Sequence, residues 1–315
     1  MKNKGLVVGL VVGLSLLALG GAVVGISIAA AGSWTGLSTC DPYVDRVIDV
    51  TSSTVDIEVD DDNNKISLVN SATAETVSIL VRENENEYYV SNEDENAFTL
   101  EYTSNIPWNI RLFYYPVNSR EMIITVPDNY DGSINVKTTN SQIDVDDLSI
   151  TGKLDLESVN GSVSVTNTSV GNDLGVYTTN SAIYVDEVVA LGDIGLHSTN
   201  GLIDLDDVES INLTAATTNG KVKAELIDVS NKMHLSATNG SLVVSDIDVD
   251  VEIKLETTNG MISGDVKGPS TDYDVNSQTT NGTNNLAGYN SQIPTTANKV
   301  LYARTYNGSI NITFK

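Results

Sequence analysis

Hydrophobic and polar residues alternate in short runs after residue 136, and these runs recur about every twenty residues. An Asn followed by Gly or Ser marks each recurrence, at Asn140, Asn160, Asn180, Asn200, Asn219, Asn239, Asn259, Asn281 and Asn307. The spacings between them are 20, 20, 20, 19, 20, 20, 22 and 26 residues. A fixed period of this length is typical of a solenoid, in which each repeat forms one coil.

Four apolar positions keep a fixed distance from these Asn residues. Three and five residues after the Asn lie aliphatic side chains, as at Ile143 and Val145, and six and four residues before the next Asn lie two more, as at Leu154 and Leu156. Each pair encloses one polar residue, which is the period of a half-buried strand, and Val, Ile and Thr favour strands over helices. We therefore predict coils stacked ~4.8 Å apart, with equivalent aliphatic side chains in columns.

A further apolar column lies eight residues after the Asn and predicts a short third face, which would make each coil roughly triangular. Its members are Leu148, Val188, Val208, Ile227 and Ile247.

The Asn-Gly steps are predicted to be tight corners between strands. Gly and Asn both adopt the left-handed backbone conformation that we expect such a corner to need. The Asn amide is both a donor and an acceptor, so stacked Asn side chains can bond to the coils above and below. We predict a structural ladder that needs no ligand, formed by Asn140, Asn160, Asn180, Asn200, Asn219, Asn239, Asn259 and Asn281.

Residues 47–135 are rich in strand-forming residues but lack the twenty-residue period. We predict strands at 54–59, 65–69, 76–82, 87–91, 97–102, 108–115 and 121–126, separated by turn-forming residues. This segment is either a meander or a set of imperfect first coils, and in both cases it caps the N-terminal end of the solenoid at 136–315. At the other end, the last strand (309–315) either pairs with another copy or is covered by the 283–304 loop.

The N-terminus predicts an export or membrane segment. Residues 1–4 carry two lysines and are expected in the cytoplasm, and residues 5–32 contain no charge. As a helix those 28 residues would be about 42 Å long, enough to span a bilayer. We expect an uncleaved anchor, followed by a linker at 33–46. The alternatives are a signal peptide cleaved near Ala29–Ala31 and a lipoprotein modified at Cys40; all three place the body outside the cytoplasm.

The charge excludes some partners. The formal net charge is −25, divided as +2 over residues 1–40, −14 over 41–135 and −13 over 136–315. No basic stripe is present, so nucleic acid is not an expected partner. The single cysteine, Cys40, allows no disulfide within the chain.

One acidic column raises the possibility of a metal. Six residues after four of the Asn residues lie Asp146, Asp186, Asp206 and Glu225, with Thr166 at the intervening position, and their carboxylate oxygens would suit Ca²⁺. Asp also favours corners for purely structural reasons, and this is the simpler interpretation. No other cofactor is indicated.

Catalysis is not predicted. An enzyme acting on polysaccharide would need acids and a base in a cleft, and the nearest candidates are Lys221 and Lys223 beside Asp206 and Glu225. His197 and His234 fall at outward strand positions in different registers, as surface residues do. Sequons outside the corners make Asn167, Asn212 and Asn311 the candidates for glycosylation.

Several segments together resemble a known family. The stretch STVDIEV at 53–59, the lead-in ITVP at 124–127 and the recurring Thr-Asn-Gly-x-Ile-x-Val coils are similar to the putative adhesin family of β-strand-repeat proteins of bacterial and archaeal surfaces. The resemblance covers about residues 47–315. It implies a single-chain, parallel β-helix-like solenoid on the cell envelope, and it supplies no catalytic residues.

The sequence as a whole therefore predicts an all-β, non-enzymatic surface protein, single-pass in the membrane with its body extracellular. It would serve as an adhesin-like binding module or a scaffold. A polysaccharide-binding or polysaccharide-cleaving β-helix is the alternative. The expected partners are the membrane and an unknown surface ligand or protein, with homo-oligomers if the last strand pairs with another copy.

Overall fold

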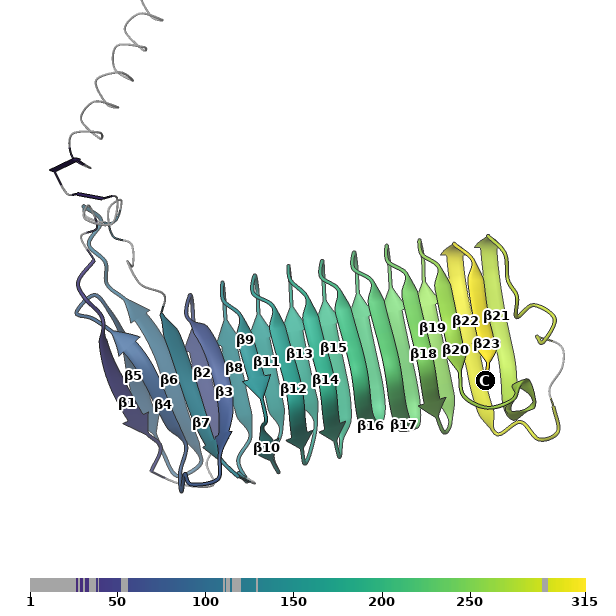
Figure 1. Cartoon of the computed structure of the whole chain (residues 1–315), viewed down its shortest axis with the longest axis horizontal. Coiled ribbons are helices and arrows are strands. Elements are labelled where there is room, and N and C mark those ends of the chain that lie inside the picture. The colour runs from purple at the N-terminus through teal and green to yellow at the C-terminus, as the bar shows by residue number, and fades with distance from the viewer. Residues whose placement is uncertain are drawn as a thin grey trace, which may run out of the picture.

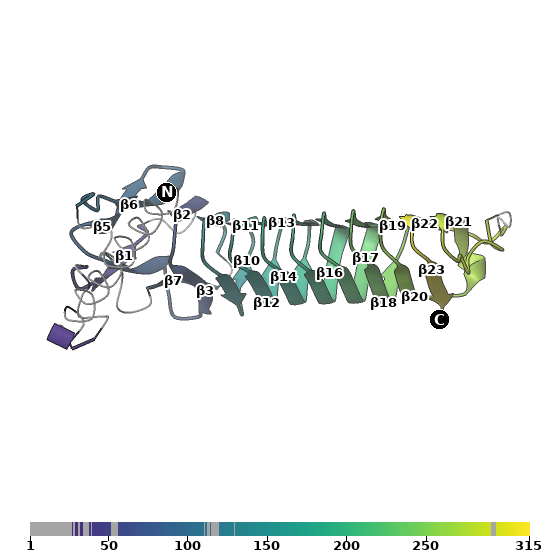
Figure 2. The ribbon, with the colours of Figure 1, turned by 90° about the horizontal axis from the view of Figure 1, so that it is seen from above.

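The computed structural model describes residues 27, 29–30, 32–33, 38, 40–51, 56–109, 111, 114, 120–128, 130–290 and 294–315. These residues form a long rod of stacked β-coils (Figures 1 and 2), so the predicted all-β solenoid is confirmed. The N-terminal strands are β1 (Val44–Asp49), β2 (Asp56–Asp61), β3 (Lys65–Ser71), β4 (Ser78–Glu83), β5 (Glu87–Glu93), β6 (Ala97–Ser104) and β7 (Glu121–Pro127).

The central coils carry the regular repeat. Their strands are β8 (Ile134–Thr138), β9 (Ile143–Asp146), β10 (Ser149–Ile150), β11 (Leu154–Ser158), β12 (Val163–Val170), β13 (Leu174–Thr178), β14 (Ile183–Ala190), β15 (Asp193–Ser198), β16 (Ile203–Thr217), β17 (Val222–Ala237), β18 (Leu242–Val249), β19 (Glu252–Thr257) and β20 (Ile262–Val266). The last elements are the short 3₁₀ turn η2 (Ser270–Asp272), β21 (Tyr273–Asn281), β22 (Lys299–Asn307) and β23 (Ile310–Phe314).

Each coil has two main faces, which meet at the Asn corner. We call the strands that lead into a corner the pre-corner face and those that leave it the post-corner face. On both faces the coils pair in parallel, and Ile143, Val163, Ile183 and Ile203 lie in successive register on the post-corner face. The register shifts locally in the β16–β17 and β18–β20 pairs. These side chains and their pre-corner counterparts are fully buried. The predicted columns are therefore confirmed, because each coil completes the core of its neighbour.

The third apolar column is also buried, from Leu148 to Ile247. It follows a bend seven residues after the Asn, where the backbone is left-handed at Asp147, Asn167, Glu187, Asp207, Leu226 and Asp246. The prediction that the Asn-Gly corner itself is left-handed was wrong. Among the described residues, positive φ occurs at none of the ladder Asn residues and at no Gly that follows one.

The corner glycines are required for a different reason. A Cβ on Gly161 would lie 1.7 Å from the carbonyl oxygen of Ser141, and one on Gly240 would lie 1.5 Å from that of Gly220. Glycine is used because adjacent coils approach too closely at this point for any side chain.

At most corners a buried hydroxyl two residues before the Asn bonds to the preceding coil or to the corner backbone. Thr217 Oγ1 donates to the carbonyl oxygen of Gly201 at 3.1 Å and accepts from the Gly220 amide at 3.0 Å. Ser158 makes the same two bonds to Ser141 and Gly161. The repeat pattern alone does not predict this role for these hydroxyls.

The N-terminal cap is built from imperfect coils, which was one of the two predicted alternatives. Strands β2 and β3 form a true coil, since β2 pairs in parallel with β8 and β3 with β9. The β6–β7 coil lies outside it, and the antiparallel strands β1, β4 and β5 close the end. Six of the seven predicted strands are present; in the seventh, Trp108 and Asn109 form a turn and most of 110–115 is outside the described residues. β1 begins at Val44, inside the predicted linker.

At the C-terminal end the spatial order of strands departs from the chain order. β22 lies between β19 and β21, and β23 pairs with β20. Residues 282–290 then fold over β23: Asn284 bridges to Ile310, and the Asn285 amide bonds to both main-chain groups of Ile312. The edge of the last strand is thus covered by its own loop, as the second of the two predicted alternatives required.

Most of the expected membrane segment at 5–32 lies outside the described residues. Within the part that is described, no helix is long and apolar enough to cross a membrane.

Candidate functional site

The Asn corners form one continuous row of side-chain amides along the rod. Each Nδ2 donates to the Oδ1 of the Asn in the preceding coil at 2.7–2.9 Å. The spatial order along the row is Asn63, Asn140, Asn160, Asn180, Asn200, Asn219, Asn239, Asn259, Asn307 and Asn281. The row is exposed to solvent, yet every amide within it is used by its neighbours. Its chemistry therefore serves the fold.

The row also contains residues that the predicted ladder lacked. Asn63 begins it, in a corner where Asp61 takes the place of the buried hydroxyl and accepts from the Asn64 amide at 2.7 Å. Asn307 lies between Asn259 and Asn281, because β22 is inserted there. The spacing of 77 residues between Asn63 and Asn140 hides the first corner from a search for a twenty-residue period.

The predicted acidic column lies on the post-corner face. Asp186 pairs with Asp206, and Asp206 with Glu225, while Asp146 is separated from Asp186 by Thr166. Among the described residues, no three His, Cys, Asp or Glu side chains are grouped as a metal site would require.

A shallow hollow of 250 Å³ lies in this column, and Ser164, Thr166, Tyr184, Val185, Asp186, Asp204, Asp206 and Lys223 line it. Lys223 Nζ lies 3.4 Å from Asp204 and 3.2 Å from Glu225. Desolvation, together with the charges of Glu225 and Asp186, raises the pKa of Asp206. The hollow is thus an acidic surface on which neighbouring carboxylates repel one another, and Lys223 partly neutralises their charge.

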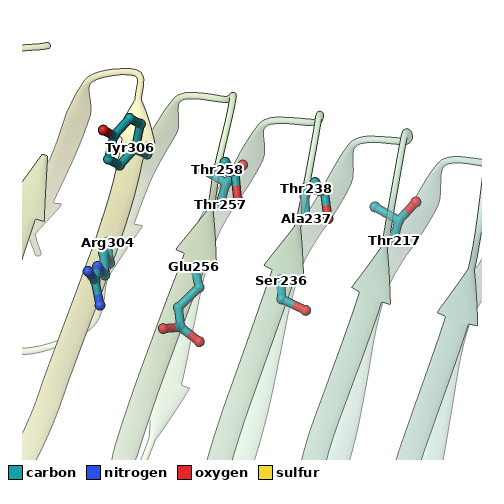
Figure 3. A pocket seen from close by; sticks show the side chains of 9 residues that line it. All are labelled: Thr217, Ser236, Ala237, Thr238, Glu256, Thr257, Thr258, Arg304 and Tyr306. Atoms are coloured by element: carbon teal, nitrogen blue, oxygen red, sulfur yellow. The ribbon is translucent and has the colours of Figure 1, made fainter. Parts of the chain in front are cut away.

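A larger hollow of 420 Å³ lies near the C-terminal end of the pre-corner face (Figure 3). Its floor is formed by small and hydroxyl-bearing side chains, and its rim by Glu256, Arg304 and Tyr306. The lining residues are Thr217, Ser236, Ala237, Thr238, Glu256, Thr257, Thr258, Arg304 and Tyr306. Tyr306 is 56% exposed, so its ring is available to a ligand.

At this rim Glu256 is in ion pairs, whereas Arg304 is in none that is described. Glu256 Oε2 lies 2.7 Å from Lys254 Nζ and 3.2 Å from His234 Nε2. Burial pushes the pKa of Glu256 upward, but the hydrogen bond and charge of Lys254, with His234, outweigh it and lower the pKa. Arg304 lies in register with Glu256 on the next strand but outside ion-pair distance of every described carboxylate. Its guanidinium is therefore free to meet a ligand.

The remaining candidates lie apart from this hollow. His197 is exposed on the pre-corner face, two positions out of register with His234. Asn167 donates to Asp147 at 3.1 Å and Asn212 to Asp193 at 2.7 Å, whereas Asn311 is exposed on β23.

The N-terminal cap holds a buried charged cluster that sequence reasoning missed. Arg120 Nη1 lies 3.1 Å from Glu87 Oε1, and the two side chains are 7% and 6% exposed. Tyr43 and Tyr102 donate to Glu87, and the Arg120 guanidinium lies over both rings. Desolvation lowers the pKa of Arg120, but Tyr102 and Glu87 more than compensate and the net shift is upward. No spacing in the sequence links residues this far apart.

These features define a class: a capped, single-chain β-solenoid whose repeated side chains serve mainly to stack its coils. A family model described as Toastrack DUF4097 matches residues 46–313, and the chain belongs to this family. This agrees with the resemblance that the sequence showed.

Two solved structures are similar to the chain. A putative adhesin from Bacteroides fragilis NCTC 9343 is 14% identical, with a TM-score of 0.44 over 88% of this chain and 99% of that chain. A putative cell adhesion protein from Clostridium sporogenes ATCC 15579 is 12% identical, with a TM-score of 0.27 over 87% of this chain and 100% of that chain. No curated protein matches the chain.

Proposed function

We propose that this protein is a non-enzymatic rod of the cell envelope, anchored through its N-terminal segment, which presents an adhesin-like binding surface away from the membrane. The observation that carries the proposal is the unbroken parallel pairing of the coils from β2 to β22. A core continuous through every coil makes the rod stiff, and a stiff rod holds a distal surface at a fixed height.

The distribution of charge supports binding over catalysis. The two lysines near the hollows, Lys223 and Lys254, are each in ion pairs with neighbouring carboxylates, which leaves Arg304 as the cation at the larger hollow without a described ion pair. A catalytic site instead concentrates groups with opposed pKa shifts in an enclosed pocket. Both hollows are shallow and lie on open strand faces.

Pull-down from intact envelopes tests this proposal, with the full chain as bait and detergent controls. We expect specific retention of an envelope component and surface exposure of an epitope placed on β14. Protection of that epitope from protease added to intact cells would contradict the proposed location.

The hollow at Glu256, Arg304 and Tyr306 favours a second candidate, polysaccharide binding. An exposed aromatic ring, hydroxyls and a guanidinium without an ion pair are groups that bind sugars through stacking and hydrogen bonds. On a glycan array, Tyr306→Ala and Arg304→Ala should each weaken binding at least ten-fold, whereas Tyr177→Ala, elsewhere on the same face, should not. Equal binding by all three variants would remove this hollow from consideration.

A further inference from the structure

The last two strands occupy a slot formed by earlier parts of the chain. If coils followed chain order, β21 would pair with β19. Instead, residues 273–281 skip one coil position, and β22 fills the gap between β19 and β21 (Figure 1). We call residues 299–315 the tail, and we call the space between β19 and β21, with the adjoining edge of β20, the slot.

The contacts of the tail with the slot are extensive. β22 is paired along its length with β19 on one side and β21 on the other, and β23 is paired with β20. Leu301, Ala303, Ile310 and Ile312 are buried there. The Asn307 amide joins Asn259 to Asn281 at 2.7 Å on each side. All these partners belong to the slot, so a tail from another copy could make each contact equally well.

Charge favours the same pairing. The tail contains Lys299, Arg304 and Lys315 and no acid, in a chain whose net charge is −25. Lys299 Nζ lies 3.0 Å from Asp248, and Lys315 Nζ lies 3.1 Å from Asp246 and 2.9 Å from Asp265. A basic tail and the aspartates of β18 and β20 beside the slot attract one another between molecules as well as within one.

The connection between slot and tail is long. Residues 282–298 comprise 17 residues, which reach about 56 Å when extended. Returning along the length of β21 takes only about 30 Å. The connection can therefore leave one rod and enter another that lies end to end with it.

We propose that the tail is an exchangeable strand pair, and that a second copy of this chain is the partner that receives it. Exchange preserves every tail–slot contact, but an extended connection releases the bonds of Asn284 and Asn285 to β23. The balance between closed monomer and exchanged dimer therefore depends on those bonds, on the connection and on local concentration. If the proposed envelope anchoring is correct, exchange would join rods at the ends that lie farthest from their membranes.

Cysteine cross-linking tests the exchange directly. Two tagged copies of the full chain are co-expressed with Cys40→Ser, one carrying Glu256→Cys and the other Arg304→Cys. These positions are register partners on adjacent strands ~4.8 Å apart, within the range for a disulfide. We expect a disulfide-linked pair that contains both tags. The second pair, Lys254→Cys with Tyr302→Cys, should behave in the same way.

The matched control is Ser236→Cys with Glu256→Cys, which are register partners on β17 and β19, where no exchange is proposed. This control should give no linked pair. Placing Glu256→Cys and Arg304→Cys in one chain should give an internal disulfide and so shows that the geometry permits the bond. An internal disulfide in that chain with no linked pair between chains would overturn the proposal. Envelope binding by a protein that stays monomeric would leave the proposed function intact.

Discussion

Individual side chains in this rod act mainly on the coil next to their own. The Asn row and the buried hydroxyls both join a corner to its predecessor, and the corner glycines leave room for that approach. A substitution at one corner therefore affects two coils, and its cost depends on whether a bond or a contact is lost.

Ala237 offers a test of the hydroxyl bridge. It is buried at the position where Thr217 and Thr257 bridge their corners, and it has no hydroxyl. Ala237→Thr should raise the free energy of unfolding by about 1 kcal/mol through new bonds to Gly220 and Gly240. Chemical denaturation measures this, with Ala237→Val as the control that adds bulk without a hydroxyl. Equal effects of Thr and Val would show that packing, and not the bridge, matters here.

Asp206 should make stability depend on pH. Its pKa is raised in the folded state from the ordinary value of 3.8, so the folded protein holds more protons than the unfolded one between the two values. Its contribution to the free energy of unfolding therefore falls as pH rises through that window. Asp206→Asn should stabilise the protein at neutral pH, and the gain should vanish as the pH falls toward 3.8.

Thermal unfolding from pH 4 to pH 8 checks this expectation. Asp228→Asn, an exposed acid in the next coil, is the control because it removes the same charge. A gain at Asp206 that is the same at every pH would contradict the assigned cause.

At the scale of strands, the two ends need special devices because an uncovered coil exposes unpaired backbone. At the C-terminal end, side-chain amides replace the missing strand. Asn290 accepts from the Ser277 amide and donates to its carbonyl, at 2.8 and 2.7 Å, on the outer edge of β21. Asn285 does the same for Ile312 on β23.

Asn290→Ala should expose the outer edge of β21. Losing two hydrogen bonds costs about 1–2 kcal/mol locally, so hydrogen exchange at Ser277 should quicken roughly ten-fold. Asn290→Asp keeps the acceptor and should show a smaller effect at the amide. Unchanged exchange in Asn290→Ala would mean that the loop covers the edge without this residue.

The N-terminal cap depends on its buried ion pair. Arg120→Met leaves the Glu87 carboxylate buried without a cation, which typically costs about 3–5 kcal/mol. Amides of β5 and β6 should then lose most of their protection from hydrogen exchange, while those of β14 should not. Glu87→Gln combined with Arg120→Met should restore much of the protection, since no unpaired charge remains. Equal loss in the single and double variants would contradict this explanation.

For the whole molecule, the sequence predicts the coil but not the order of the coils. The aliphatic columns at Ile143 and Leu154 follow from periodicity, because every coil must bury the same positions. Nothing in that period states which coil lies beside which. β22 lies between β19 and β21, and the β2–β3 coil lies between the β6–β7 coil and the β8–β9 coil. Both placements depend on contacts between segments that are distant in the chain.

The candidate site was less predictable than the fold. The hollow at Glu256, Arg304 and Tyr306 exists because β22 is placed next to β19, although Glu256 and Arg304 are 48 positions apart in the chain. The acidic column could be read from the repeat, but its neutralisation by Lys223 could not. Side chains at repeated positions are predictable from the period. Side chains that come together because a strand lies out of chain order, as β22 does beside β19, are not.

Distances between pairs of spin labels, measured by double electron–electron resonance, test the central claim that the coils stack in register in the order observed. Spin labels are placed at Asp155 together with Lys254, Tyr302 or Asn276, which occupy one outward column, in a Cys40→Ser background. At ~4.8 Å per coil, the monomer should give about 24, 29 and 34 Å for the three pairs. A distance to Asn276 shorter than that to Tyr302, or distances that do not grow by one coil spacing at each step, would contradict the account.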